Sequence, residues 1–379
     1  MLIHAQRLVT ADEVYEPGLL RTEGDRVVEV GPRHGSGDAG RPDVEVGTLA
    51  PGLVDVHSHG GGGASFSTDP ATAIEAHRRT GTTTQVASLV TETYDDLEAQ
   101  VRMLAPYVES GELAGIHLEG PWLAAARCGA HDPALLRDPD PAEVARLLDL
   151  GRGHVRQVTF APERKGALEL VGTLVDAGVH AAVGHTAADY AQVAAAVEAG
   201  ADIATHLFNG MDPWHHRTPG AVPALLRAAV QGEVVLELIA DGVHLADETV
   251  ATVMDLVGPD RVVFVSDAMA AAGVGDGRYV LGGLAVVVTD GVARLDHGPG
   301  EPPGPIAGGT SHVADLVARA VRAGMPLAYA AEAGSATPAR LLGLEDRGVL
   351  APGARADLVV VDDVGQVARV MRAGRWLDA

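Results

Sequence analysis

The chain has 379 residues, of which 47% are hydrophobic and 21% are charged; these fractions are typical of a globular protein and exclude a disordered one. Its formal net charge of −23 argues against binding to nucleic acid or an anionic membrane surface, because phosphate groups would be repelled over most of the protein. No apolar run is long enough to cross a membrane and no targeting segment is evident, so we expect a cytoplasmic protein. The single cysteine, Cys128, excludes an intramolecular disulfide and fits a reducing compartment.

The two ends of the chain share a pattern of short strands. Brief apolar runs alternate there with Gly, Pro and Asp turns, which is typical of a small sheet. These runs cover residues 2–3, 26–30, 43–46, 357–362 and 367–371. Because chain termini often lie close together, we expect residues 1–50 and 346–379 to form one small β-sandwich domain, and residues 51–345 to form a larger one.

Between these ends, apolar runs rich in Val, Ile and Thr alternate with helical segments. Eight candidate strands end near His57, Ser88, Glu119, Ala161, His185, His206, Asp241 and Asp267. The helical segments lie around residues 71–80, 93–109, 141–150, 166–178, 189–199, 220–230 and 246–257. This alternation predicts an α/β fold, a parallel (β/α)₈ barrel of the TIM type, with functional side chains at the C-terminal ends of the strands. After the last strand we expect one hairpin, from residues 279–281 to 292–295 around Asp290 and Gly291.

The first candidate strand of the barrel ends in two histidines, His57 and His59, and is followed by glycines at residues 60–63. In a strand, residues i and i+2 point to the same side, so both imidazoles would project together, as metal ligands do. The glycines allow a sharp turn and keep bulk away from the imidazoles. By itself the pair is also compatible with two histidines on a solvated strand end.

Four further strand ends carry a histidine or an acid, at Glu119, His185, His206 and Asp267. A lone histidine after an apolar strand is usually structural, but four at one face of a barrel indicate a metal site. Nitrogen and carboxylate ligands are those that catalytic divalent metals use. A two-metal arrangement would use the whole set: His57, His59 and Asp267 on one metal, His185 and His206 on the other, and Glu119 as the bridge.

Longer motifs connect these residues to a known family. Residues 51–60, Pro-Gly-Leu-Val-Asp-Val-His-Ser-His-Gly, and residues 353–360, Gly-Ala-Arg-Ala-Asp-Leu-Val-Val, resemble signatures of the amidohydrolase superfamily. A narrower resemblance rests on residues 117–122, 129–133, 184–186, 206–211, 241–244 and 266–269. Through these segments the chain resembles the N-acetylglucosamine-6-phosphate deacetylases almost from end to end.

The lysine content bears on the bridging ligand. Many members of the superfamily bridge two metals with a carbamylated lysine. This chain has one lysine, Lys165, which lies beyond an expected strand, next to Glu163 and Arg164, and is best interpreted as a surface residue. Glu119 is then left as the bridging acid, which is the deacetylase arrangement. The resemblance implies one or two divalent metal ions, zinc in the first place, with iron, manganese or cobalt as alternatives.

The resemblance also implies an activity and a set of roles. The expected enzyme converts N-acetylglucosamine 6-phosphate to glucosamine 6-phosphate and acetate. A metal-activated hydroxide attacks the acetamide carbonyl, Asp267 acts as general base and then as general acid, and His131 polarises the carbonyl. The implied substrate-binding residues are Ala130, His131, Asn209, Gly210, Arg217, His244, Ile306, Ala307 and Gly308. A homodimer is implied, in which His244 reaches the phosphate from the neighbouring subunit.

Two positions depart from the family pattern. Gly210 stands where alanine is common, and Gly309 stands where serine is frequent. Both changes are small, and they lie where backbone contacts matter more than side chains. Cys128 precedes His131 in the same loop; we expect an incidental thiol there, with a gating role as the alternative.

Two other functions remain open. One is a different amidohydrolase, such as a dihydroorotase-like cyclic amidase or a nucleobase deaminase, which would favour a bridging lysine and would lack Arg217 and His131. The other is a catalytically inactive barrel that binds phosphosugars, which loss of Asp267 or of the histidines would indicate. The chain keeps these residues, so the deacetylase is the leading hypothesis.

Overall fold

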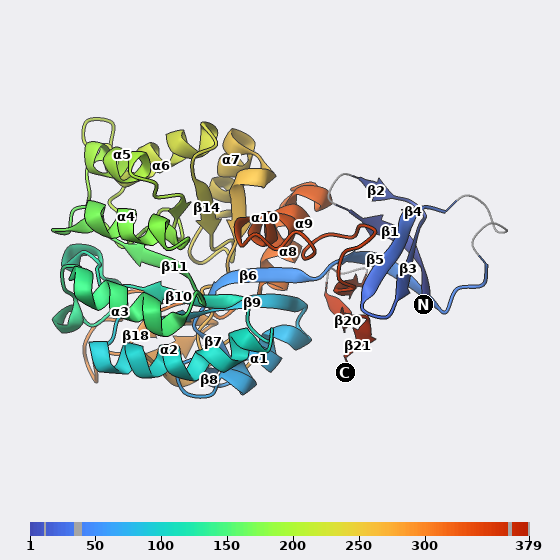
Figure 1. Ribbon diagram of the computed structural model, residues 1–379, viewed down its shortest axis with the longest axis horizontal. Coiled ribbons are helices and arrows are strands. Elements are labelled where there is room, and N and C mark those ends of the chain that lie inside the picture. Colours follow the sequence, from blue (N-terminus) through green and yellow to red (C-terminus); the bar gives the residue numbers. More distant parts are fainter. Residues whose placement is uncertain (11–12, 34–39, 363–365, 378–379) are drawn as a thin grey trace.

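The larger part of the protein is a barrel of eight parallel strands (Figure 1). The computed structural model describes residues 1–10, 13–33, 40–362 and 366–377. The barrel strands are β6 (Leu53–Ser58), β9 (Thr82–Leu89), β10 (Gly115–Glu119), β11 (Val155–Phe160), β12 (His180–Val183), β13 (Ile203–Ala204), β14 (Val235–Leu238) and β15 (Val262–Phe264). Each pairs with the next in chain order, which confirms the predicted barrel.

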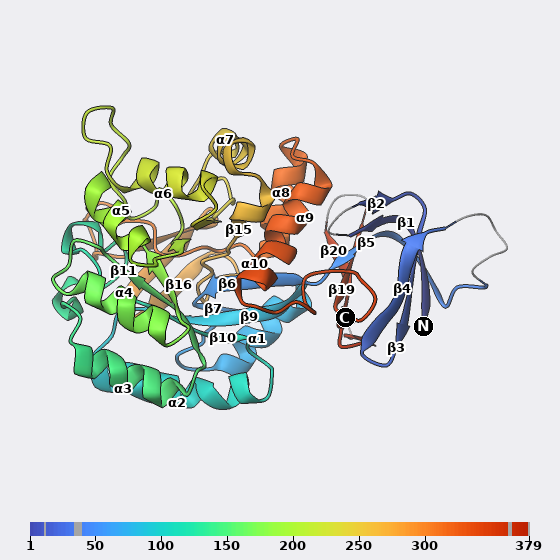
Figure 2. The same ribbon diagram turned by 45° about the horizontal axis from the view of Figure 1, so that its top comes forward.

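Helices cover the outside of the barrel (Figure 2). They are α1 (Pro70–Arg79), α2 (Tyr94–Glu109), α3 (Pro141–Gly151), α4 (Ala167–Asp176), α5 (Tyr190–Glu198), α6 (Ala221–Val230) and α7 (Asp247–Val257), followed by α8 (Val313–Arg322), α9 (Leu327–Gly334) and α10 (Ala336–Leu341). Several begin at a polar side chain that accepts a backbone N–H of the first turn, as Asp69, Thr93 and Asp140 do. Their apolar faces pack on the strands, so the strand residues are buried from both sides.

The barrel closes just beyond the ends of its first and last strands. The backbone N–H of Asp267 donates to the carbonyl of His57 (2.9 Å), and the N–H of His59 donates to the carbonyl of Ala268 (2.7 Å). Below them, the Ser266 hydroxyl donates to the buried carboxylate of Asp55 (2.5 Å). These contacts bring the start and the end of the barrel sequence to one place.

A second sheet is built from both ends of the chain. Its eight strands are β1 (Leu2–Val9), β2 (Val14–Tyr15), β3 (Gly18–Glu23), β4 (Arg26–Pro32), β5 (Val44–Pro51), β19 (Leu358–Val361), β20 (Val367–Arg372) and β21 (Arg375–Trp376). β5 joins the two ends, because it pairs in parallel with β1 and antiparallel with β19. Leu20, Leu49 and Leu358 are fully buried in a small core of this unit. The predicted sheet from both chain ends is confirmed and its strands form one sheet, while a separate β-sandwich domain with the bounds 1–50 and 346–379 stays a prediction.

Two small sheets follow strand ends of the barrel. β7 (Gly60–Gly61) and β8 (Ala64–Ser65) form a short hairpin after His59. The insertion after β15 has three strands, β16 (Gly277–Leu281), β17 (Leu284–Thr289) and β18 (Val292–Leu295), so the prediction of a single hairpin was incomplete. Gly282 and Gly283 both have positive φ and make a second two-residue turn between β16 and β17.

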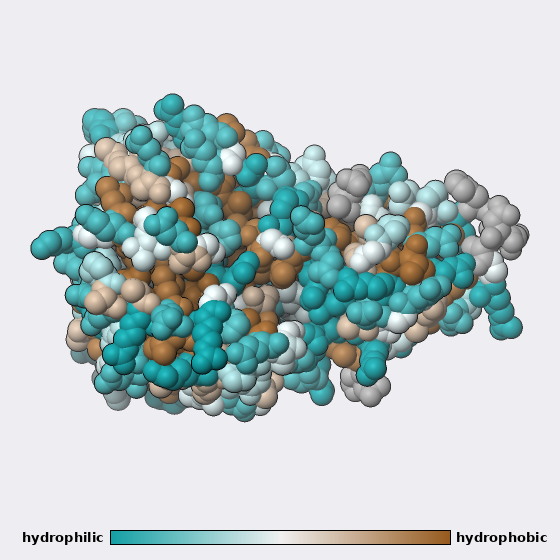
Figure 3. All heavy atoms as spheres, viewed as in Figure 1, coloured by the Kyte–Doolittle hydropathy of each residue, from teal (hydrophilic) through white to brown (hydrophobic). Residues whose placement is uncertain are grey.

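On the face shown in Figure 3, hydrophilic residues lie mainly around the periphery, and hydrophobic residues gather in the middle of the barrel part. Among the helices of the described residues, none has the length and apolar character needed to cross a membrane.

Gly309 allows a test of the barrel closure. Its N–H donates to the carbonyl of Asp267 and its carbonyl accepts from Met269, and a Cβ at this position would lie 2.2 Å from the carbonyl oxygen of Ser266. We expect Gly309→Ala to lower the free energy of unfolding by about 1–3 kcal/mol, because the loop must move off the closure. The change is measured by denaturant unfolding.

Gly172 provides the matched control. It lies within α4 and a Cβ there would meet no atom within 4 Å. Gly172→Ala should therefore raise the stability by roughly 0.5–1 kcal/mol. A Gly309→Ala protein as stable as the wild type would show that the loop can shift freely.

Candidate metal centre

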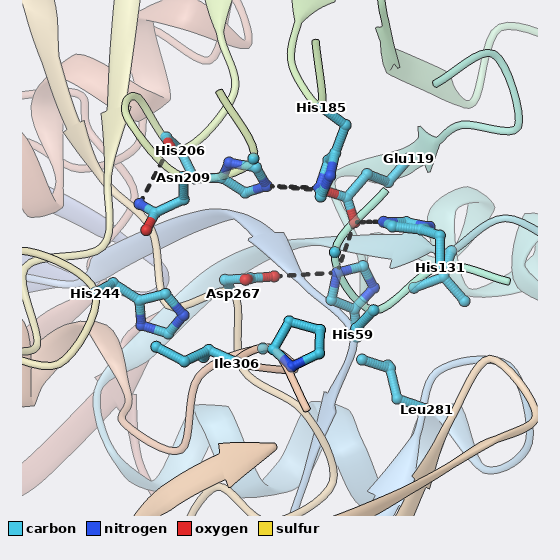
Figure 4. Close-up of a pocket in the computed structure, with 16 residues that line it drawn as sticks. His59, Glu119, His131, His185, His206, Asn209, His244, Asp267, Leu281 and Ile306 are labelled. Atoms are coloured by element: carbon cyan, nitrogen blue, oxygen red, sulfur yellow. Dashed lines mark hydrogen bonds and ion pairs between the residues drawn. The ribbon is translucent and has the colours of Figure 1, made fainter. Parts of the chain in front are cut away.

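Six side chains from different parts of the barrel converge at its C-terminal mouth, and Figure 4 draws all of them except His57. They are His57 near the end of strand β6, His59 just after β6, Glu119 at the end of β10, His185 and His206 just after β12 and β13, and Asp267 after β15. Parallel strands bring their C-terminal ends to one side of a barrel, which is why residues more than 200 positions apart meet here. All six candidate ligands of the sequence analysis are therefore brought together, although their roles stay predictions.

Glu119 lies at the centre of the group. Its Oε1 is 3.1 Å from Nε2 of His185 and 3.0 Å from Nε2 of His206. Its Oε2 is 3.1 Å from Nε2 of His59. One carboxylate thus faces imidazoles from three strands, as a bridging ligand would.

The histidines are oriented by the bonds of their outer nitrogens. Nδ1 of His57 donates to Oε2 of Glu237 (3.0 Å), and Nδ1 of His59 donates to the carbonyl of Ser88 (3.2 Å). Nδ1 of His185 donates to the carbonyl of Arg127 (2.8 Å). These acceptors place the proton on Nδ1 and leave the Nε2 lone pair facing the carboxylates.

The residues present fit a divalent cation. Nε2 of His57 is buried and has no hydrogen-bond partner among the described residues, while Oδ1 of Asp267 lies 3.4 Å away. Two sets of ligand atoms lie within 4.8 Å of one another: His57, His59, Glu119 and Asp267 in the first, and Glu119, His131 and His185 in the second. The first set has the composition expected for one metal. In the second set His131 takes the place expected for His206, although Nε2 of His206 is 3.1 Å from Nε2 of His185.

Electrostatics keep Glu119 ionised despite its burial. Burial alone would raise its pKa, but contacts with His57, His131 and His185 hold the pKa of this carboxyl well below its ordinary value. For His59, burial would lower the pKa, but hydrogen bonds to Asp267 and Glu119 raise the pKa of the imidazole to about 9. The ionised carboxylates of Glu119 and Asp267 are thus stabilised by positive charge beside them, which can come from protonated histidines or from a metal ion.

His131 differs from the other histidines in its tautomer. The backbone N–H of Thr91 donates to its Nδ1 (3.2 Å), so the proton of the neutral ring lies on Nε2, 3.4 Å from Oε2 of Glu119. Burial lowers the pKa of His131 to about 4, which keeps the ring neutral. A neutral ring with an Nε2–H cannot ligate a metal through that atom, but it can donate to a substrate oxygen. This geometry favours the carbonyl-polarising role over a ligand role.

Three of the converging residues have a strained backbone. His185, His206 and Asp267 have φ values of 46°, 26° and 46°, which lie in the left-handed region. Such conformations cost about 1–3 kcal/mol each and occur at functional sites, where the surrounding structure holds them. Here each follows a strand end.

A cavity of about 210 Å³ opens beside these residues. Six of the predicted substrate-binding residues line it besides His131, namely Ala130, Asn209, Gly210, His244, Ile306 and Gly308. Val90, Leu281 and Pro305 also line it and were missed. Val90 directly follows β9, so its strand-end position was the available signal, whereas Leu281 belongs to the insertion and gave none.

Ala307 does not line the cavity. It is fully buried against Met269 and Leu281, and its N–H donates to the carbonyl of Ala293. Alternate residues of an extended segment point to opposite sides, so Ile306 faces the cavity while Ala307 faces the insertion. The Ala307 side chain therefore does not face this cavity, and its part in substrate binding stays a prediction.

Arg217 and His244 also lie differently from the expectation. Arg217 lies on the loop between β13 and α6, outside the cavity, with its guanidinium against the His216 ring (2.7 Å). His244 lines the cavity of its own chain, and Nδ1 donates to Oδ2 of Asp241 (2.8 Å). His244 therefore needs no neighbouring subunit to reach this site.

Two further residues bear on the alternatives. Lys165 is exposed in the turn after β11, as predicted, and does not line the cavity. Cys128 is half-buried, and burial raises the pKa of its thiol, which keeps it protonated and weakly nucleophilic.

Comparison with known proteins agrees with this geometry. Residues 48–377 match the amidohydrolase family, and the chain belongs to that family. A solved N-acetyl-D-glucosamine-6-phosphate deacetylase from Mycobacterium smegmatis, a D267A mutant in complex with N-acetyl-D-glucosamine-6-phosphate, is 47% identical. That match covers 99% of this chain and 98% of the other, with a TM-score of 0.93.

Curated relatives give the same grouping. The N-acetylglucosamine-6-phosphate deacetylase of Homo sapiens is 36% identical over 83% of this chain and 80% of its own. The N-acetylgalactosamine-6-phosphate deacetylase of Escherichia coli O157:H7 is 33% identical over 99% of this chain and 98% of its own. Within the amidohydrolases, the chain thus falls among the N-acetylglucosamine-6-phosphate deacetylases and their N-acetylgalactosamine counterpart.

The Asp241–His244 pair gives a test of the site's electrostatics. Burial lowers the pKa of His244, but the hydrogen bond and charge of Asp241 outweigh it, so the pKa is raised above the ordinary value. The protonated form therefore persists to higher pH and is lost as the pH rises through the raised pKa. In Asp241→Asn the midpoint should move to lower pH, measured by NMR titration of the His244 imidazole.

Asp276→Asn serves as the control for this titration. Asp276 caps the amides of Asp290 and Gly291 in the same way, on an exposed turn. The Asp276→Asn substitution should leave the midpoint of the His244 titration unchanged. An unchanged midpoint in Asp241→Asn itself would contradict the assigned cause.

Proposed function

We propose that the protein hydrolyses the acetamide of N-acetylglucosamine 6-phosphate and releases glucosamine 6-phosphate and acetate. The observation that carries the proposal is Glu119, which faces the imidazoles of three strands while the Nε2–H of His131 points into the same cavity. The similarity to deacetylases along the whole chain supports the substrate class.

The ligand set supports one or two divalent metal ions, and we propose zinc in the first place, with iron, manganese or cobalt as alternatives. Imidazole nitrogens mixed with carboxylate oxygens suit these ions. His57, His59 and Asp267 would hold one ion, His185 and His206 the other, and Glu119 would bridge them. A divalent metal there supplies Lewis acidity, which brings the pKa of water near neutrality and polarises a carbonyl.

The protein's own residues handle the protons. Asp267 takes a proton from the attacking water and later delivers it to the leaving nitrogen, so the C–N bond breaks as an amine forms. Its pKa is lowered, because hydrogen bonding to His59 and the charge of His57 outweigh its burial, so the group is ionised, which is the form that a general base requires. His131 donates from Nε2 to the acyl oxygen, where negative charge develops.

The phosphate needs a local cation in a protein of net charge −23. His244 fits this need, since Asp241 favours its protonated form at the edge of the cavity. Asn209, Gly210, Ile306 and Gly308 complete the proposed sugar-binding wall. N-acetylgalactosamine 6-phosphate is a second candidate substrate, because a relative named for it matches 99% of this chain.

The test is acetate release by the purified protein from each of the two sugar phosphates, before and after chelation. We expect turnover that chelation removes and that zinc, manganese, cobalt or iron restores. Asp267→Asn should keep the fold and lower kcat by about 10²–10⁴-fold, because proton transfer is lost. The absence of acetate release from folded protein with every metal would contradict the proposal and favour a cyclic amidase, a deaminase or an inactive phosphosugar-binding barrel.

We also propose a homodimer and a cytoplasmic location. The single, half-buried cysteine supports a reducing compartment. The loop that carries Arg217 projects beyond α5 and α6 (Figure 2), and its Trp214 is 60% exposed, which is unusual for so large an apolar side chain. If Arg217 binds phosphate, it must do so in the cavity of a second copy, because it lies outside its own.

Light scattering and a mixing experiment test this assembly. We expect the mass of a dimer, and partial recovery of activity when the separately inactive Asp267→Asn and Arg217→Ala chains are mixed. Recovery would come from mixed dimers, in which one cavity combines an intact Asp267 with an intact Arg217 of the other chain. Mixing Asp267→Asn with Asp267→Ala is the control and should restore nothing, and a monomeric mass would overturn the proposal.

A further inference from the structure

A buried carboxylate lies behind the candidate metal centre and has no part in the mechanism described above. Glu237 stands in the middle of β14, in the sequence Val-Leu-Glu-Leu, and is fully buried. It faces the interior of the barrel and does not line the cavity. A charged group at such a position is costly unless it is paired, so its contacts call for an explanation.

Both oxygens of the Glu237 carboxylate accept hydrogen bonds. Oε2 accepts from Nδ1 of His57 (3.0 Å) and from the backbone N–H of His206 (3.2 Å). Oε1 accepts from Nε2 of Gln157 (2.7 Å). The carbonyl of Glu237 also accepts from the N–H of Leu207 (2.8 Å). One residue thus contacts a ligand of the first proposed metal and the main chain of a ligand of the second.

The His57 ring is confined on another side by His117. The two rings meet edge to face with 4.5 Å between their centroids. His117 is itself held, because Nδ1 bonds the Ser88 hydroxyl (2.9 Å) and Nε2 bonds the Thr159 hydroxyl (2.8 Å). Packing limits the tilt of the His57 ring, but only the acceptor at Nδ1 decides which nitrogen carries the proton.

Among the three oriented histidines, His57 alone has a charged acceptor. His59 and His185 donate Nδ1–H to backbone carbonyls, which are neutral. A carboxylate at Nδ1 makes the opposite nitrogen a stronger electron-pair donor. Nε2 of His57 is also the buried nitrogen that lacks a hydrogen-bond partner within the described residues.

We propose that Glu237 is a positioning residue of the metal centre: its carboxylate holds the proton on Nδ1 of His57 and anchors the main chain at His206. Metal affinity then depends on a group that touches neither metal nor substrate. The inference rests on the proposed function, since it assumes that the site binds a divalent ion.

The test is the affinity of metal-free protein for zinc, measured by competition with a chromogenic chelator, which needs no substrate. Glu237→Gln removes the charge but keeps an acceptor for His57, and the amide of Gln157, whose Oε1 has no partner among the described residues, can turn to accept from the new amide. We expect zinc binding to weaken by about 10–100-fold in Glu237→Gln, and further in Glu237→Ala, which removes the acceptor.

Glu98→Gln is the matched control. Glu98 is also largely buried and paired, with Arg146, but it lies on α2, remote from the site. It should bind zinc as the wild type does. Melting of the metal-free proteins separates the two roles: a purely structural Glu237 would lower the melting temperature without changing zinc affinity in folded protein, which overturns the proposal.

The other outcomes are equally distinct. Zinc affinities of both Glu237 variants within twofold of the wild type would overturn this inference alone. A wild-type protein that binds no divalent metal would overturn the proposed function, and this inference with it.

Discussion

The barrel closure between β6 and the segment after β15 is the constraint on which the site depends. Hydrogen bonds from Asp267 to His57 and from His59 to Ala268 join the first and last strand ends, and Ser266 binds Asp55 beneath them. A slip of one residue in this joint would turn the histidines away from Asp267, because side chains alternate along a strand. Gly309 packs against the same joint, where the neighbouring backbone leaves no room for a side chain. The hydrogen bonds that close the barrel therefore fix the geometry of the candidate metal centre.

The interior of the barrel below this joint is polar, and this polarity has a physical role. Ser88, His117, Thr159 and Thr205 are buried and bonded to one another in a chain of hydroxyl and imidazole contacts. Burying such groups is unfavourable unless their hydrogen bonds are made, and here they are made largely with one another. A chain of fixed bonds holds imidazole rings more firmly than apolar packing does, since it also sets their protons. The polar layer thus exchanges some stability for definite ligand orientation.

Charge is arranged on two scales. The whole chain is strongly acidic, yet the mouth of the barrel gathers imidazoles around Glu119 and Asp267, and His244 lies at the cavity edge with its protonated form favoured. An anionic sugar phosphate would be repelled by most of the surface and attracted only where positive charge is concentrated. The acidic surface is therefore compatible with an anionic substrate, provided that the cations of the site are placed precisely.

The barrel, its strand ends and the six converging residues could be predicted from the amino-acid sequence, because strand period and strand-end position are local properties and parallel strands carry their ends to one face. The family resemblance added the expectation that Glu119, and not the one lysine, is the central acid. The folded structure was needed to show which nitrogen of each ring faces inward, because that depends on partners distant in sequence, such as Glu237 for His57 and Thr91 for His131. It likewise turned Ala307 away from the cavity, placed Arg217 outside it and put His244 inside its own chain's site. A motif indicates which residues belong to a site. Whether the side chain of each residue faces the cavity depends on how the loops pack.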